Sequence, residues 1–171
     1  MHELQKIQLQ DLPASGWHWH ADVPRTQLED EQSGHVDALH MLISDARWDV
    51  DLQRQGGCYH LSGSWQARVG RHCSRCNAAF EMNMQGETLR DFQLADGASG
   101  EDDVLPPPGK LNFLDVLRED IWLAWRLTVV CKQDCKGLCQ RCGKNLNEGL
   151  CACPAGDGDH PFAALRTLKL D

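Results

Sequence analysis

Cysteine spacing in the last third of the chain limits most strongly how this sequence can fold. Six of the nine cysteines lie between Cys131 and Cys153. Cys139 and Cys142, followed by a glycine, have the spacing of a metal knuckle, in which a tight turn points two thiolates at one ion. Cys151 and Cys153 would lie on one side of an extended segment and supply a second pair. The sequence therefore predicts a metal-binding module with these four ligands.

The other cysteines leave the number of metal sites open. Cys131 and Cys135 are four residues apart and would share one face of a helical turn. Cys73 and Cys76 form a second C-x-x-C pair, for which a reduced thiol pair is the alternative to metal binding. The spacing is compatible with one site and spare cysteines, a shared two-metal cluster, or two separate sites. Two sites would require Cys73 and Cys76 to meet Cys131 and Cys135, with Cys58 left over.

Zinc is the expected metal, as one or two structural ions. An all-thiolate tetrahedral site suits zinc and iron alike, so a rubredoxin-like iron site is the alternative, but nothing else in the sequence indicates electron transfer. No open ligand position or adjoining general base indicates catalytic zinc. A phosphate loop, a dinucleotide-binding fingerprint and a nucleophile elbow are also absent. We therefore expect no enzymatic activity and no small-molecule substrate.

The start of the chain and its hydropathy bear on location. The first thirty residues lack the basic start, apolar core and cleavage site of a signal peptide. No window approaches the roughly eighteen apolar residues that a membrane span needs. We therefore expect a cytoplasmic protein without membrane contact, in which closely spaced cysteines favour metal over disulfides.

A small basic segment stands out from the acidic chain. The formal net charge of −8 argues against broad binding to nucleic acid. Five cations nevertheless fall close together, and they are candidate contacts for RNA or a protein partner: Arg126, Lys132, Lys136, Arg141 and Lys144. Asp134 is the acid among them, and a zinc ion with four thiolates would add about −2. Ordinary surface charge is the alternative interpretation.

Alternating apolar and polar residues predict a β-rich body. Residues 46–52, 61–69 and 80–84 have the pattern of half-buried strands. A Gly-Gly turn at 56–57 separates the first two, and residues 70–77 would form the loop of a long hairpin. These segments indicate an antiparallel meander.

A main helix is expected after this meander. Asn112 can cap it, and Asp115 in its first turn complements the helix dipole. Apolar side chains recur there at helical spacing, namely Leu114, Leu117, Ile121 and Trp125. This stripe predicts that the helix packs on the sheet.

The predicted fold class is α+β: an antiparallel β-rich body with one main helix and a C-terminal zinc-ribbon-like cysteine module. The stretch before the helix is acidic and contains three consecutive prolines, a composition that cannot supply a packed core. The chain thus divides into a β-rich domain with the C-x-x-C hairpin (1–94), an acidic Pro/Gly linker (95–109), the helix (110–127), the cysteine-rich metal module (128–153) and a C-terminal tail (154–171).

The first thirty-five residues carry a weaker pattern. Candidate strand residues for the same sheet are Ile7, Leu9, Trp17 and Trp19. His18 and His20 would share one face of a strand and could chelate a metal. We expect them instead to be exposed, opposite buried tryptophans, and outside the site.

The run C-x-x-x-C-x-G-L-C-x-x-C-G-x-N-L-N over residues 131–147, followed by C-x-C at 151–153, resembles the YceD family of bacterial and plastid proteins. The resemblance extends to the C-x-R-C of residues 73–76, to the acidic linker and Leu-rich helix with Glu119, and to the P-F-A-A-L segment at 161–165. It covers most of the chain from about Trp48 onward.

The resemblance implies a ribosome-biogenesis factor that promotes accumulation of large-subunit (23S) ribosomal RNA. The implied partner is ribosomal RNA, a precursor large subunit or a ribosomal protein. Some family members lack the C-terminal cysteine cluster, which implies that the metal supports the module and does not perform the shared function. Two other hypotheses remain: a redox or electron-transfer protein, and a zinc-supported interaction module unrelated to ribosomes.

Overall fold

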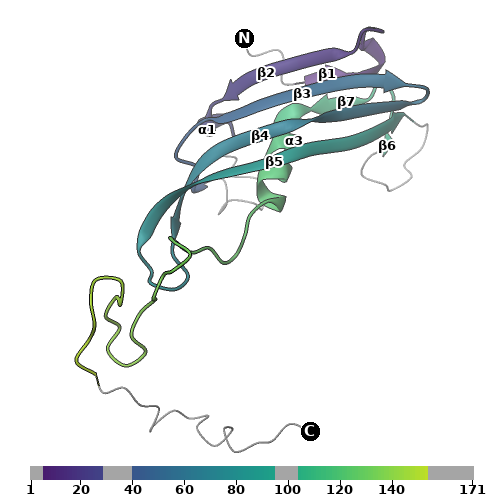
Figure 1. Ribbon diagram of the computed structural model, residues 1–171. Helices are drawn as coiled ribbons and strands as arrows, with labels where there is room; N and C mark the ends of the chain where they lie inside the picture. The colour runs from purple at the N-terminus through teal and green to yellow at the C-terminus, as the bar shows by residue number, and fades with distance from the viewer. Residues whose placement is uncertain (1–5, 29–39, 95–103, 154–171) are drawn as a thin grey trace, which may run out of the picture.

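The computed structural model describes residues 6–28, 40–94 and 104–153. Figure 1 shows a curled sheet with one main helix against it, and a cysteine-rich segment beyond one end of the long central hairpin. The elements are β1 (Lys6–Gln8), the 3-10 turn η2 (Leu9–Asp11), β2 (Trp17–Val23), α1 (Arg25–Leu28), β3 (Ala46–Gln55), β4 (Cys58–His72), β5 (Ala79–Leu94), β6 (Val104–Leu105), β7 (Lys110–Asn112) and α3 (Phe113–Leu123).

The antiparallel meander predicted from the sequence is confirmed. The main sheet has the order β2-β3-β4-β5-β6, in which β6 runs parallel to β5 and the other neighbours are antiparallel. Strand β4 extends to His72 and β5 begins at Ala79, so the hairpin loop is shorter than the predicted 70–77. Gly86 on β5 makes room for a neighbour, because a Cβ there would lie 2.9 Å from the Trp65 indole.

Alternate residues of the strands form a core against α3. Trp48, Leu52 and Leu61 face inward and are almost fully buried, as is Leu117 of the helix. The predicted cap is also confirmed, because the Asn112 side chain accepts a hydrogen bond from the backbone N–H of Leu114. Leu114, Leu117 and Ile121 of the expected stripe thus pack on the sheet, whereas Trp125 lies beyond the end of the helix.

The helix is shorter than the predicted range 110–127. Residues Lys110–Asn112 form β7, which pairs antiparallel with β1 in a separate two-stranded sheet. The helix ends at Leu123. The extended β7 backbone leads directly into the Asn112 cap, and local helical spacing does not reveal pairing with a strand more than a hundred residues earlier.

The end of the predicted linker belongs to the folded body. Residues 95–103 lie outside the described residues, but Val104 and Leu105 pair with the end of β5. The carbonyl oxygen of Gly109 accepts a hydrogen bond from the backbone N–H of Leu9 at 2.9 Å. Composition predicted an acidic linker here, yet two residues suffice for edge pairing once the sheet offers an open edge. The predicted tail, 154–171, also lies outside the described residues.

The N-terminal residues add to the body in two ways. Trp17 and Trp19 lie on β2 and pack against the core, with the Trp19 ring 5.2 Å from that of Trp48. His18 and His20 are exposed on the opposite face, as expected, and contact Asp51 and Asp49 at 3.0 and 2.7 Å. Ile7 and Leu9 do not join the main sheet. They lie in β1 and η2.

A buried polar chain joins the helix to the sheet. The indole N–H of Trp48 donates to the Thr88 hydroxyl at 3.0 Å, and that hydroxyl donates to Asp120 of α3. Arg90 contacts the other carboxylate oxygen of Asp120 at 2.7 Å. Burial raises the pKa of Asp120, against the opposing effects of Thr88 and Arg90.

Among the described residues, none of the helices has the length and hydropathy of a membrane span.

Candidate metal centres

The first cluster consists of Cys73, Cys76, Cys131 and Cys135. Their four Sγ atoms all lie within 4.8 Å of one another, with Cys73 to Cys135 and Cys76 to Cys131 each 3.7 Å apart. A tetrahedral zinc site with Zn–S bonds of about 2.3 Å requires sulfur–sulfur separations of about 3.8 Å. The cysteines are free, since a disulfide would bring two sulfurs to about 2 Å. The spacing therefore suits one tetrahedral ion.

The hairpin loop forms half of this cluster through a tight turn. The backbone N–H of Cys73 donates to Ala78 at 2.9 Å, and the N–H of Asn77 donates back to the Cys73 carbonyl at 2.8 Å. Asn77 has a φ of 54°, in the left-handed region that asparagine tolerates better than most residues. The turn points both thiols of the C-x-x-C pair toward the chain that follows α3.

Backbone and side-chain hydrogen bonds connect the chain after α3 to the hairpin loop. Ser74 donates from its N–H to Val129 at 2.8 Å, and Val129 donates to the Ser74 hydroxyl at 3.1 Å. Leu138 donates to the Arg75 carbonyl at 3.1 Å, while the Arg75 guanidinium donates to the Cys135 carbonyl at 3.2 Å. The hairpin loop and the 128–138 segment thus meet, which is the arrangement that two separate sites require.

The second cluster consists of Cys139, Cys142, Cys151 and Cys153, whose Sγ atoms also lie within 4.8 Å of one another. Cys139 and Cys151 approach to 3.4 Å. The knuckle closes where Gly143, with a φ of 71°, donates its N–H to the Cys139 carbonyl at 2.8 Å. This cluster is more exposed than the first, in which three of the four cysteines are buried.

Proton binding in the first cluster is unequal. Burial raises the pKa of Cys73, but backbone N–H groups of Cys131, Cys76 and Arg75 outweigh it and lower the pKa to about 6. Burial and the neighbouring thiols raise the pKa of Cys131 to about 12. Four crowded thiols cannot all ionise without a cation, so they titrate as a unit. A divalent ion would displace the remaining protons.

The second cluster shows the same division. Backbone N–H groups of Cys142 and Arg141 lower the pKa of Cys139 to about 6. Hydrogen bonding to Cys142 and burial raise the pKa of Cys153 to about 12. Each cluster therefore combines a thiol that ionises readily with one that resists ionisation.

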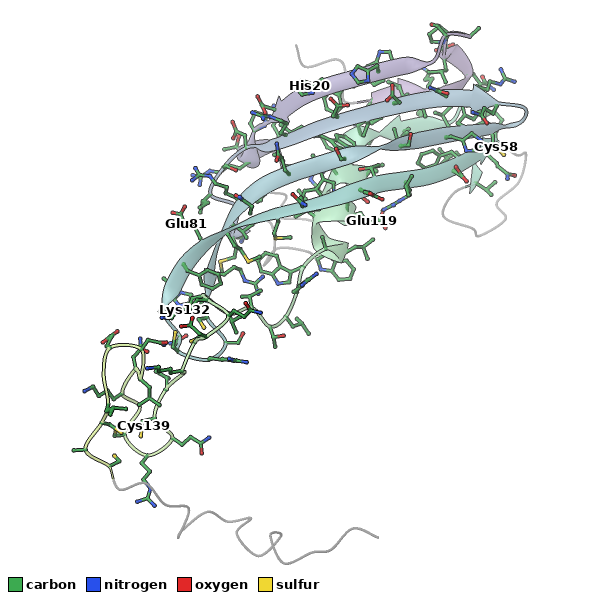
Figure 2. All side chains as sticks on the ribbon, viewed as in Figure 1. His20, Cys58, Glu81, Glu119, Lys132 and Cys139 are labelled. Carbon is green, nitrogen blue, oxygen red and sulfur yellow. The ribbon has the colours of Figure 1, made fainter. Side chains whose placement is uncertain are left out.

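The part of the chain after α3, residues 124–153, is called the cysteine-rich end. It carries the five candidate contact cations, and all five are exposed. Lys144 donates from Nζ to the Leu150 carbonyl at 2.9 Å. Figure 2 shows Lys132 near the hairpin loop and Cys139 farther out, with Cys58 at the opposite end of the sheet. Cys58 therefore belongs to neither cluster.

A groove of about 880 Å³ lies between β5 and the chain that leaves α3. Phe80, Met82 and Trp125 line it, and the Arg71 guanidinium lies 3.8 Å from the centre of the Trp125 ring. Exposed apolar side chains occur along the same chain segment, including Leu127, which is 88% exposed. The groove is not evident in the sequence, because its walls come from segments that are distant along the chain.

Asn147 is a further residue that spacing did not identify. It lies between the ligand pairs of the second cluster, yet its side-chain amide donates to the Sγ of Cys135 in the first cluster at 3.4 Å. That hydrogen bond is the main reason why the pKa of Cys135 is lowered. An asparagine between two cysteine pairs is unremarkable in sequence, and only the fold shows which sulfur it contacts.

Sequence comparisons with known proteins identify a family for this chain. The family profile described as "Large ribosomal RNA subunit accumulation protein YceD" matches residues 61–169. A protein of Arabidopsis thaliana named "Large ribosomal RNA subunit accumulation protein YCED homolog 1, chloroplastic" is 31% identical over 71 residues. That alignment covers 40% of this chain and 22% of the Arabidopsis protein. No solved structure matches the chain. The profile spans β5, α3 and both cysteine clusters, and the chain belongs to the YceD family.

Proposed function

We propose that this protein is a non-enzymatic ribosome-biogenesis factor that promotes the accumulation of large-subunit (23S) ribosomal RNA in the cytoplasm. The observation that carries the proposal is the family match over residues 61–169, because it includes the long hairpin, the helix and the cysteine-rich end as one unit. The family description names accumulation of an RNA and no reaction, which supports a binding role.

Each cluster holds one structural zinc ion in this proposal. The sulfur separations suit a tetrahedral ion, and every ligand position is taken by cysteine, so none stays open for a substrate. The segment 128–153 has few buried side chains of its own, and metal binding would supply its folding free energy. A purified protein that is colourless and contains two zinc ions supports this assignment. A coloured protein with iron and a reversible redox wave would instead favour electron transfer.

The cysteine-rich end is the proposed contact surface for ribosomal RNA. Residues 124–153 carry five basic and two acidic side chains, whereas residues 1–123 carry ten basic and twenty acidic ones. Two zinc centres of about −2 each would offset the local excess. The contact therefore depends on a few cations close to phosphates and not on long-range attraction. A basic ribosomal protein bound to the acidic body is the competing partner.

Capture from a reduced lysate, with and without nuclease, tests the role. We expect large-subunit RNA and its precursor particles to be recovered with the wild-type protein, and Lys132→Glu with Lys136→Glu to reduce recovery. Lys6→Glu with Lys110→Glu, on β1 and β7 away from the clusters, is the matched charge control. Recovery that survives nuclease points to a ribosomal protein as the direct partner. Recovery of no ribosomal component, or only of unrelated proteins, would contradict the proposed function.

A further inference from the structure

The side-chain amide of Asn147 makes three hydrogen bonds within the cysteine-rich end. Its Nδ2 donates to the Sγ of Cys135 at 3.4 Å and to the Oδ1 of Asn145 at 2.8 Å. Its Oδ1 accepts from the backbone N–H of Lys136 at 3.0 Å. Rotating the amide by 180° would place its oxygen against a sulfur and its NH₂ group against an N–H donor. The network therefore defines one orientation.

The backbone around Asn147 is held along the segment that joins the clusters. Leu146 donates its N–H to the Gly137 carbonyl at 2.9 Å, and Cys139 donates to the Lys144 carbonyl at 2.8 Å. The chain between Cys142 and the C-x-C pair of the second cluster consequently folds back over the residues that follow Cys135. A change in the second cluster would move Asn147 relative to the first.

We propose that Asn147 couples the two metal sites, so that an ion in the second cluster strengthens binding of an ion in the first. Closing the second cluster fixes the ends of the segment that carries Asn147. The ordered amide then donates to the Cys135 thiolate and offsets part of its negative charge. This coupling rests on the proposed metal binding, and by linkage the first ion must strengthen binding of the second by the same factor.

Hydrogen bonds to metal ligands usually change metal affinity by about ten- to hundred-fold when they are removed. We expect Asn147→Ala to weaken first-cluster binding by a factor in that range. Asn147→Asp should weaken it further, because it keeps the acceptor for Lys136 but places a negative oxygen against the sulfur. Asn83→Ala, on the exposed face of β5, is the matched control and should bind two ions with unchanged affinity.

Competition for zinc with a chromophoric chelator measures these affinities, and ¹¹³Cd NMR of the cadmium-loaded protein resolves the two sites. Cys142→Ser, which disables the second cluster, should weaken the first by about the same factor as Asn147→Ala. The double variant should be no weaker than Cys142→Ser alone. Those results would support the coupling.

Independent behaviour would overturn the inference. If the wild type binds two ions and Asn147→Ala or Cys142→Ser leaves the first site unchanged, the clusters are uncoupled although metal binding stands. Additive losses in the double variant lead to the same conclusion. A wild-type protein without metal would remove both the coupling and the metal assignment.

Discussion

The β body, which comprises the two sheets and α3, and the cysteine-rich end are each stabilised by a different interaction. The body buries aromatic and aliphatic side chains between the main sheet and α3. Among residues 124–153, Cys135 and Gly137 are the buried residues, and both lie at the first cluster. Apolar burial is the main driving force of folding for the body. The cysteine-rich end buries too few side chains for that, and in our proposal metal binding supplies its folding free energy. We therefore expect the two parts to differ in their sensitivity to metal removal and to core substitutions.

The largest effect should come from breaking the second cluster. Cys142→Ser should lower the metal content from two ions to one and open residues 139–153 to protease, because no apolar core replaces the lost metal. Apparent zinc-binding free energies of about 10–16 kcal/mol in zinc-finger peptides indicate the scale of that loss. Elemental analysis and limited proteolysis followed by mass spectrometry measure both outcomes. Cys58→Ser is the matched control and should retain both ions.

A core substitution should affect the body instead. Leu117 is fully buried between α3 and the sheet, and Leu117→Ala should cost about 2–5 kcal/mol of unfolding free energy. Leu127→Ala should cost less than about 0.5 kcal/mol, because that side chain is 88% exposed. Denaturant unfolding followed by tryptophan fluorescence measures the difference. Loss of metal from Leu117→Ala at a temperature where the body stays folded would show that the two units are not separate.

The buried polar chain offers a smaller perturbation of the body. Thr88→Val removes the hydroxyl between Trp48 and Asp120 with little change in shape. It should cost about 1–3 kcal/mol, since two buried polar groups lose a partner. Thr128→Val is the control, because Thr128 is exposed and is not part of this hydrogen-bonded network. Equal unfolding free energies for the two variants would argue against the bridging role of Thr88.

The smallest expected effect is a pH dependence from Asp120. Burial raises its pKa in the folded protein above the ordinary value of 3.8. Well below pH 3.8 the Asp120 carboxyl group is protonated in both the folded and the unfolded state. As the pH rises, the unfolded state releases this proton first, and the folded state releases it only at its higher pKa. This group therefore lowers stability as pH increases over that window, by about 1.4 kcal/mol per unit of raised pKa. Asp120→Asn should remove this part of the pH profile of the melting temperature.

Local chemistry made much of this fold predictable. Alternation identified β3, β4 and β5, and Asn112 identified the start of α3, because these patterns depend on neighbours in sequence. The pairing of β1 with β7 and of β6 with β5 was not predictable, since short edge strands take their partners from the rest of the fold. The link from Trp48 through Thr88 to Asp120 was hidden for the same reason.

The candidate sites divide in a similar way. Close spacing grouped Cys139 with Cys142, whereas assigning Cys73 and Cys76 to the same cluster as Cys131 and Cys135 required the hairpin loop to be located in space. The cysteine spacing in the sequence was compatible with that arrangement, but also with other numbers of metal sites. The contact with Asn147 lay beyond spacing altogether, because it crosses from one cluster to the other.

The first cluster takes two of its thiols from the end of the long hairpin and two from the chain beyond the helix. Unfolding the sheet must separate these pairs, so an ion held in the proposed first site would be released with it. The free concentration of metal therefore enters the folding equilibrium of the body itself, at about 1.4 kcal/mol for each tenfold change above the dissociation constant. If the proposed zinc sites are occupied in the cell, zinc shortage would leave a less stable sheet as well as a less ordered cysteine-rich end at residues 124–153, and less of the protein would survive proteolysis.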